Sequence, residues 1–125
     1  MYDPKDPMLA RIREIALAFP EAAEKESHGR PAFYTKKVFA YYSGSEKVDG
    51  EWVQHPQALM ILPDPAERAA LEDDERFWVP GYLGRSGWLG IDLDDRTDFT
   101  ELAELLEDSY RATAPNHLVR RLSTP

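Results

Sequence analysis

Three helix-start signals constrain the fold of this 125-residue chain more than any other feature of its sequence. Each is an aspartate followed by a residue that suits a first helical turn: Asp6-Pro7, Asp64-Pro65 and Asp98-Phe99. An aspartate side chain caps free backbone N–H groups, and proline at the first helical position has no N–H to satisfy. These signals predict a helix near each end and one in the middle, and they confine any strands to the two intervals between them.

The first and last predicted helices each carry one apolar face. Apolar residues recur at helical spacing from Met8 to Phe19, where Pro20 ends the pattern, and again from Leu102 to Tyr110. Such spacing is typical of helices that pack one side against a core. We therefore expect both helices to cover the same core.

About five short strands are predicted in the two intervals. They are rich in aromatic and aliphatic residues and cover residues 32–34, 38–42, 58–62, 77–82 and 88–93.

The polar segments between these strands are predicted to hold the turns. Residues 35–37 are the expected hairpin connection, and Asp49-Gly50 is a favoured pair for a two-residue turn. Trp52 and Val53 follow that pair, so we expect strand pairing to extend into the polar stretch. Residues 21–25 are interpreted as a polar link.

The predicted order of elements is α-β-β-β-α-β-β-α. Short sequential strands with hairpin-type links favour an antiparallel sheet, and one face of that sheet would carry the helices. The sequence therefore predicts a two-layer α+β fold. No repeat, linker or low-complexity segment interrupts residues 1–125, so we expect one domain with its core over residues 8–114.

The net charge of −8 limits the partners that suit this chain. A domain that binds nucleic acid usually presents a basic face, because neutralising phosphates supplies most of its affinity. The absence of cysteine excludes disulfides and cysteine-ligated metal sites. The N-terminus lacks the apolar segment of a signal peptide, and the longest apolar run, residues 58–62, is too short to cross a bilayer. We expect a cytoplasmic protein.

Six short motifs, in order along the chain, resemble those of the MmcQ/YjbR family. The most distinctive are a Gly-x-Pro-x-Phe turn ending at Phe33, a Lys-x-Phe-Ala strand beginning at Lys37, and Ser109-Tyr110 in the last helix. All six lie at residues 19–21, 28–33, 37–40, 65–68, 87–93 and 109–110.

The resemblance implies a small α+β fold, often likened to secretion-chaperone or CyaY-like folds. Many members of the family are labelled DNA-binding, largely from comparison of folds, and no enzyme mechanism is implied. This sequence departs from the family pattern at Glu21, where glycine is common, and in a longer polar segment between its second and third strands.

No catalytic or metal-binding motif is present in the sequence. Residues 84–88 approach a serine-hydrolase elbow, but that motif requires glycine where Trp88 stands. His28, His55 and His117 are far apart and form no zinc motif, and His55 is expected to be exposed in a polar loop. We therefore predict no catalytic residues, no metal and no cofactor.

Basic and aromatic residues gather between positions 28 and 48. This segment has four lysines and arginines against one acid, a local charge of +3. Such residues can hold an anionic or planar ligand by charge-assisted hydrogen bonds and stacking. A simpler interpretation is that Lys36 and Lys37 only solvate a hairpin turn. Trp88 and Tyr110 belong either to the core or to the wall of a cleft. The candidate ligand-binding residues are His28, Arg30, Phe33, Lys36, Lys37, Trp88 and Tyr110.

Three functions remain open. The first is a non-enzymatic binding or adaptor domain whose partner is a small anionic or planar ligand, or a protein. The second is DNA binding, which the resemblance suggests and the net charge of −8 disfavours. The third is a small enzyme that acts on an anionic metabolite, with His28 as the acid–base group. A monomer and a homodimer are both compatible with the sequence, and no membrane partner is expected.

Overall fold

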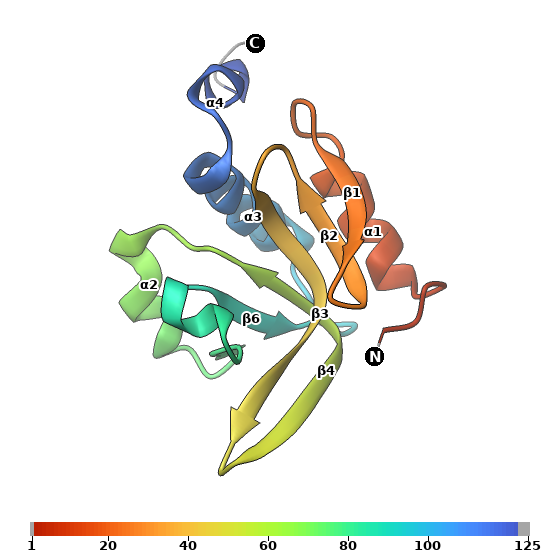
Figure 1. Cartoon of the computed structure of the whole chain (residues 1–125), viewed down its shortest axis with the longest axis vertical. Coiled ribbons are helices and arrows are strands. Elements are labelled where there is room, and N and C mark those ends of the chain that lie inside the picture. Colours follow the sequence, from red (N-terminus) through yellow and green to blue (C-terminus); the bar gives the residue numbers. More distant parts are fainter. Residues whose placement is uncertain (1, 123–125) are drawn as a thin grey trace.

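The protein contains a six-stranded antiparallel sheet with helices packed on one of its faces (Figure 1). The computed structural model describes residues 2–122. The strands are β1 (Ala23–Ser27), β2 (Arg30–Tyr34), β3 (Val38–Val48), β4 (Glu51–Ile61), β5 (Phe77–Trp78) and β6 (Leu89–Asp92), in the spatial order β1-β2-β3-β4-β6-β5. The helices are α1 (Pro7–Ala16), α2 (Pro65–Glu72), α3 (Phe99–Thr113) and α4 (Asn116–Leu122), with a 3₁₀ turn, η1 (Leu83–Ser86). The predicted α+β class is confirmed.

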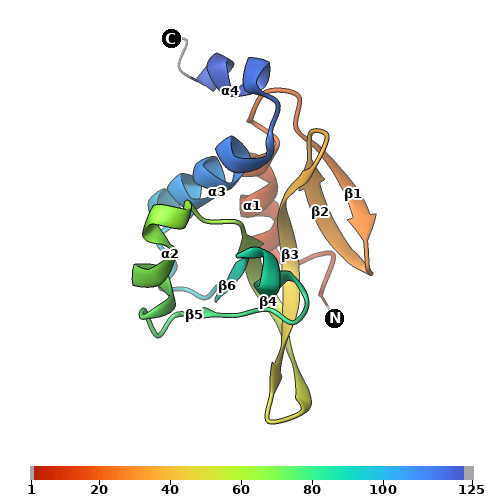
Figure 2. The same cartoon turned by 60° about the vertical axis from the view of Figure 1, so that its left-hand side comes forward.

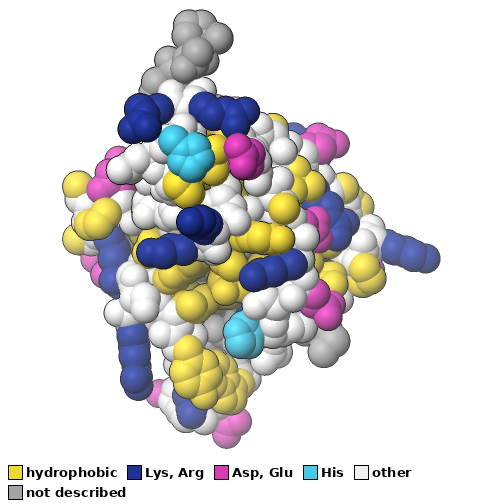
Figure 3. All heavy atoms as spheres, turned by 45° about the horizontal axis from the view of Figure 1, so that its top comes forward, with side chains coloured by type: hydrophobic (Ala, Val, Ile, Leu, Met, Phe, Trp, Pro, Cys, Tyr) yellow, Lys and Arg dark blue, Asp and Glu magenta, His cyan; other side chains and the backbone are white. Residues whose placement is uncertain are grey.

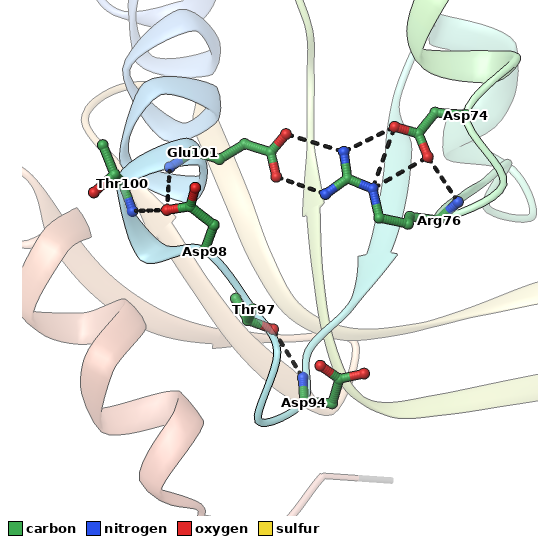
Figure 4. Close-up of polar contacts among 7 residues, drawn as sticks. All are labelled: Asp74, Arg76, Asp94, Thr97, Asp98, Thr100 and Glu101. Atoms are coloured by element: carbon green, nitrogen blue, oxygen red, sulfur yellow. Dashed lines mark hydrogen bonds and ion pairs between the residues drawn. The ribbon is translucent and has the colours of Figure 1, made fainter.

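The three predicted helix starts are capped as expected. Asp6, Asp64 and Asp98 each accept hydrogen bonds from backbone N–H groups in the first turn of α1, α2 and α3. Figure 4 shows Asp98 accepting the N–H groups of Thr100 and Glu101. Local chemistry therefore sets where these helices begin.

A second contact in Figure 4 ties the α2–β5 connection to the start of α3. The guanidinium of Arg76 donates hydrogen bonds to Asp74 on one side and to Glu101 on the other, with N–O distances of 2.8 and 2.7 Å. The carboxylates of Glu101 and Asp74 raise the pKa of Arg76 above its already high usual value. The arginine therefore stays charged and joins two segments that the sequence separates.

The core lies between the sheet and the helices α1 and α3. α1 ends at Ala16, earlier than the predicted residue 19, and the chain between Ala16 and Pro20 continues in turns. Phe19 still packs into the core, where its ring centroid lies 5.9 Å from Phe39 and 5.0 Å from Tyr110. The largest fully buried side chains include Phe33, Phe39, Tyr42, Leu59, Ile61, Leu89, Leu102, Leu106 and Tyr110.

β3 and β4 form a long hairpin whose outer half extends beyond the rest of the sheet (Figures 1 and 2). Asp49 and Gly50 make its turn, with φ angles of 50° and 81°. Positive φ at both turn positions matches the twist of the flanking strands. The prediction that pairing extends past Asp49-Gly50 is confirmed. We call residues 44–55 the arm.

The sequence prediction missed one strand and overextended another. Residues 23–27, interpreted as part of a polar link and turn, form β1 at the edge of the sheet, where polar side chains meet solvent. Strand β5 covers only Phe77–Trp78 instead of residues 77–82, since Pro80 lacks the N–H group that strand pairing needs. The sequence leaves open whether the tail from residue 116 forms a short basic helix or frays. Residues 116–122 form the helix α4, and residues 123–125 of that tail lie outside the described residues.

The sheet face opposite α1 and α3 is covered by side chains of its own. Trp78 lies flat across two glycines, since a Cβ atom on Gly44 or Gly90 would come within 2.7 or 2.4 Å of its ring. His55 stacks on the same ring, with centroids 3.9 Å apart and an angle of 14° between planes. We call the sheet face that carries Trp78 and His55 the open face, because α1 and α3 pack on the other face.

Candidate ligand-binding cleft

A cleft of about 470 Å³ opens on the open face of the sheet. Its floor includes Tyr41 and Met60, which pair across β3 and β4. Their chain neighbours point into the core, so side-chain alternation places these two residues on the opposite face. The residues that line the cleft are His28, Arg30, Tyr41, Ser45, Trp52, Met60, Gly81, Tyr82 and Leu83.

Arg30 brings a half-buried positive charge to one side of the cleft. Its Nη1 donates a long hydrogen bond of 3.4 Å to the carbonyl of Ser43, and its Nε is buried without a partner. Within residues 2–122, Arg30 forms no ion pair with a carboxylate. Burial lowers the pKa of Arg30, and the nearby Tyr41 only partly offsets that effect. A half-buried cation without an ionic partner is stabilised when an anion binds beside it.

His28 stands next to Arg30 because of a tight turn between β1 and β2. Ser27 pairs with Arg30, so His28 and Gly29 form a two-residue hairpin loop, with φ angles of 55° and 76°. Positive φ at the first position usually goes to Asn, Asp or Gly. The turn fixes the imidazole at the rim of the cleft.

Two aromatic rings form a wall of the cleft. The ring centroids of Trp52, from the arm, and Tyr82, from the β5–η1 connection, lie 5.6 Å apart. Gly81 allows this contact, since a Cβ atom there would lie 2.4 Å from the Trp52 ring. The N–H group of Gly81 also bonds to the carbonyl of Ser45 at 3.0 Å, which joins the connection to the arm.

Tyr82 is held in a strained backbone conformation. Its φ and ψ are 63° and −61°, and the N–H of Leu83 bonds to the carbonyl of Gly81 at 2.7 Å. These values describe a γ-turn with positive φ, which is rare for a residue with a side chain. Strain of this kind costs about 1–3 kcal/mol and is concentrated at functional sites. Its ring, 80% exposed, stands at the mouth of the cleft.

The seven residues proposed from the sequence do not all converge. His28 and Arg30 line the cleft, and Trp88 reaches its floor through Tyr41, with ring centroids 5.5 Å apart. Lys36 and Lys37 lie in the β2–β3 turn, at the end of β2 away from Arg30.

The remaining two proposed residues belong to the core. Phe33 and Tyr110 are fully buried on the helical side of the sheet, and the Tyr110 hydroxyl donates to the carbonyl of Pro20 at 2.7 Å. Because their side chains lie on the other side of the sheet from the cleft, we leave them out of the site.

Sequence reasoning missed the aromatic wall. Trp52 was interpreted only as an extension of the predicted hairpin, and Tyr82, 30 positions further on, as the end of a predicted strand. One signal was present: Trp52 lies in a polar hairpin, where a tryptophan has no predicted core to pack against. The pair Gly81-Tyr82 did not indicate a site, because the backbone strain at Tyr82 arises only in the folded connection.

His55 differs from the prediction that it is exposed. Its side chain is only 12% exposed, and its Nδ1 and Nε2 lie 2.6 Å from Asp92 and 2.7 Å from Glu46. Trp78 also donates from Nε1 to Asp92 at 3.2 Å. His55, Glu46, Asp92 and Trp78 together form what we call the histidine clamp. It joins β3, β4, β5 and β6.

Hydrophobic and basic side chains lie together on the surface shown in Figure 3. Yellow hydrophobic groups run through its centre, dark blue Lys and Arg side chains border them, and most acidic side chains lie toward the margin. Among residues 2–122, no cluster of three or more His, Asp or Glu side chains is suited to a metal ion.

Fold and cleft together define a small α+β domain with an open antiparallel sheet and one cationic, aromatic cleft. The chain belongs to the YjbR family, whose family model matches residues 17–112. No curated protein matches the chain.

Two solved structures have a similar fold. A Deinococcus radiodurans protein, DR2400, with the domain called DUF419, is 20% identical with a TM-score of 0.64, over 97% of this chain and 93% of that one. A Pseudomonas syringae protein is 13% identical with a TM-score of 0.63, over 83% of this chain and 97% of that one. At such identities the likeness concerns the fold alone. Within residues 2–122, no helix is long and apolar enough to span a membrane.

Proposed function

We propose that this protein is a non-enzymatic binding domain that takes a small anionic ligand with a planar part in the cleft. The observation that carries the proposal is Arg30: a half-buried guanidinium with a partnerless Nε, at the side of an aromatic cleft. Buried cations normally have a carboxylate partner, so a site of this kind is complete only when an anion arrives.

The aromatic side of the cleft supports the planar part of the ligand. Trp52 and Tyr82 are large exposed rings, and exposed hydrophobic patches usually mark interaction sites. Met60 and Leu83 add apolar surface. A mainly apolar pocket with a few polar groups is the usual form of a small-molecule site.

Two other functions have less support. A catalytic role for His28 requires a partner that orients the imidazole, and His28 forms no hydrogen bond within residues 2–122. DNA binding requires a continuous basic surface, whereas Arg13, Arg111 and Arg121 each pair with a glutamate.

A ligand screen by thermal shift tests the proposal. Small aromatic anions should raise the melting temperature of the wild-type protein, since a ligand that binds only the folded state stabilises it. Arg30→Gln should remove that increase. Lys37→Gln is the matched control, because it removes the same charge from the β2–β3 turn. Hits that survive Arg30→Gln, or a screen in which no aromatic anion stabilises the wild type, contradict the proposal.

A further inference from the structure

The charges around the cleft limit the charge of its ligand. Of the residues that line it, Arg30 is the one with a permanent positive charge, and none is acidic. Lys36 and Lys37 lie at the far end of β2. The ammonium of Lys47 is placed 5.3 Å from the centroid of the Trp52 ring, at the rim rather than inside. The interior of the cleft therefore offers one cation to a ligand.

A ligand with two charges fits this interior poorly. A phosphate monoester carries about −1.5 to −2 at neutral pH. One guanidinium would leave much of that charge uncompensated, inside a mainly apolar cleft of a protein with a net charge of −8. A carboxylate carries a single charge, which Arg30 can neutralise.

The other polar side chains that line the cleft carry no permanent positive charge: His28, Tyr41, Ser45 and Tyr82. The rings of Trp52 and Tyr82 supply the apolar surface against which a flat group would lie.

The volume limits the ligand to one small molecule. At about 470 Å³, the cleft falls in the lower part of the range of roughly 300–1,000 Å³ that small-molecule sites occupy. It holds one or two fused rings, not a polymer segment.

We infer that the cleft selects aromatic monocarboxylates, with the carboxylate on Arg30 and the ring against Trp52 and Tyr82. This inference rests on the proposed function and adds the chemical class of the ligand.

Three probes of nearly the same shape test it: 2-naphthoate, its neutral amide 2-naphthamide, and 2-naphthyl phosphate. Isothermal titration calorimetry on the full chain gives a Kd for each. We expect 2-naphthoate to bind more tightly than either other probe by about tenfold or more, the effect of one charge-assisted contact.

Variants locate the preference. Arg30→Gln should make the carboxylate and the amide bind equally, Arg30→Lys should restore part of the difference, and Lys37→Gln should leave it unchanged. Trp52→Leu should weaken all three probes by a similar factor. A circular dichroism spectrum and melting temperature for each variant separate these effects from misfolding.

The outcomes distinguish the inference from the proposed function. If the phosphate or the amide binds as tightly as the carboxylate and Arg30→Gln still weakens binding, the cleft is a ligand site but the monocarboxylate class is wrong. If none of the three probes binds at millimolar concentration, both fail. If the carboxylate preference persists in Arg30→Gln, the assigned contact is wrong.

Discussion

Asp6 connects three separate parts of the chain through one buried carboxylate. It accepts the N–H of Met8 at 2.9 Å, the hydroxyl of Tyr42 at 2.5 Å and the amide of Gln57 at 3.0 Å. Burial alone would raise the pKa of Asp6, but the hydrogen bonds from Tyr42, Met8 and Gln57 outweigh burial and lower it. A carboxyl group with a lowered folded-state pKa adds stability above its unfolded-state pKa, and this stability is lost as the pH falls through the folded-state value.

Replacing Tyr42 with phenylalanine tests this account. The free energy of unfolding at pH 7 should fall by about 1.5–3 kcal/mol, the usual range for a hydrogen bond to a charged group. The loss should shrink below about pH 4, where Asp6 takes up a proton in both proteins. Urea denaturation across a pH series measures both effects. Tyr34→Phe, which removes a hydroxyl outside this network, is the control, and a loss that stays constant with pH contradicts the role of Asp6.

Gly90 permits the position of Trp78, and this too can be measured. In Gly90→Ala the new Cβ atom would lie 2.4 Å from the Trp78 ring, so the ring must move. Overpacking of this kind costs about 1–3 kcal/mol of unfolding free energy. The cost should disappear in the background of Trp78→Leu, where the ring is absent. A double-mutant cycle without coupling would show that the two residues do not interfere.

At the residue scale, local roles were predictable and distant ones were not. The cap formed by Asp6 follows from the Asp-Pro pair, whereas its partners Tyr42 and Gln57 are 36 and 51 positions away. His28 and Arg30 were proposed because they are basic and near aromatics. That Arg30 is half-buried without a carboxylate depends on the tertiary fold.

Among the elements, the arm depends most on a single cluster of side chains. Its two strands extend beyond the helical layer, so the helices do not hold their outer half (Figure 2). The histidine clamp holds its base instead. Both ring nitrogens of His55 lie within hydrogen-bond distance of carboxylate oxygens, Nδ1 beside Asp92 and Nε2 beside Glu46.

The variant His55→Phe keeps a ring over Trp78 and removes both hydrogen bonds. We expect the stability to fall by roughly 1–2 kcal/mol, a moderate value because Asp92 is largely exposed. Backbone amides of the arm should exchange with solvent faster, while those of residues 38–42 and 58–61 should keep their protection. Hydrogen exchange measured residue by residue shows this, and equal exchange in variant and wild type would remove the clamp from the account.

Prediction at the element scale succeeded where short-range signals exist. Helix caps and the Asp49-Gly50 turn need only neighbouring residues, and all of them appear in the structure. Strand β1 was missed because Ala-Glu-Lys-Glu-Ser has no apolar alternation, and an edge strand with solvent on several sides does not need one. Its pairing with β2 is set by the His28-Gly29 turn.

For the whole molecule, charge decides which polymers can bind. The net charge is −8, and several arginines are already paired with carboxylates. Nucleic-acid affinity comes mainly from free cations that neutralise phosphates. We expect no retarded band in an electrophoretic shift assay with duplex DNA at low salt and micromolar protein. A retarded band that weakens steeply as salt is added would support DNA binding instead.

The architecture was predictable at this scale because the helix signals and the strand signals indicate the same fold class. Capped amphipathic helices and short strands joined by hairpins leave few alternatives to an antiparallel α+β fold. The position of the cleft was not predictable, because it forms where the arm, the β1–β2 turn and the strained Tyr82 connection meet. Those three segments are far apart in the sequence and come together only in the folded sheet.

The charged edge strand β1 has a consequence for crowded solutions. If two copies joined their sheets through antiparallel β1 strands centred on Lys25, that lysine would face its own copy, and Glu24 would face Glu26. Like charges directly opposite each other oppose strand pairing. In this register like charges therefore face each other, which opposes the joining of two sheets through their β1 edges.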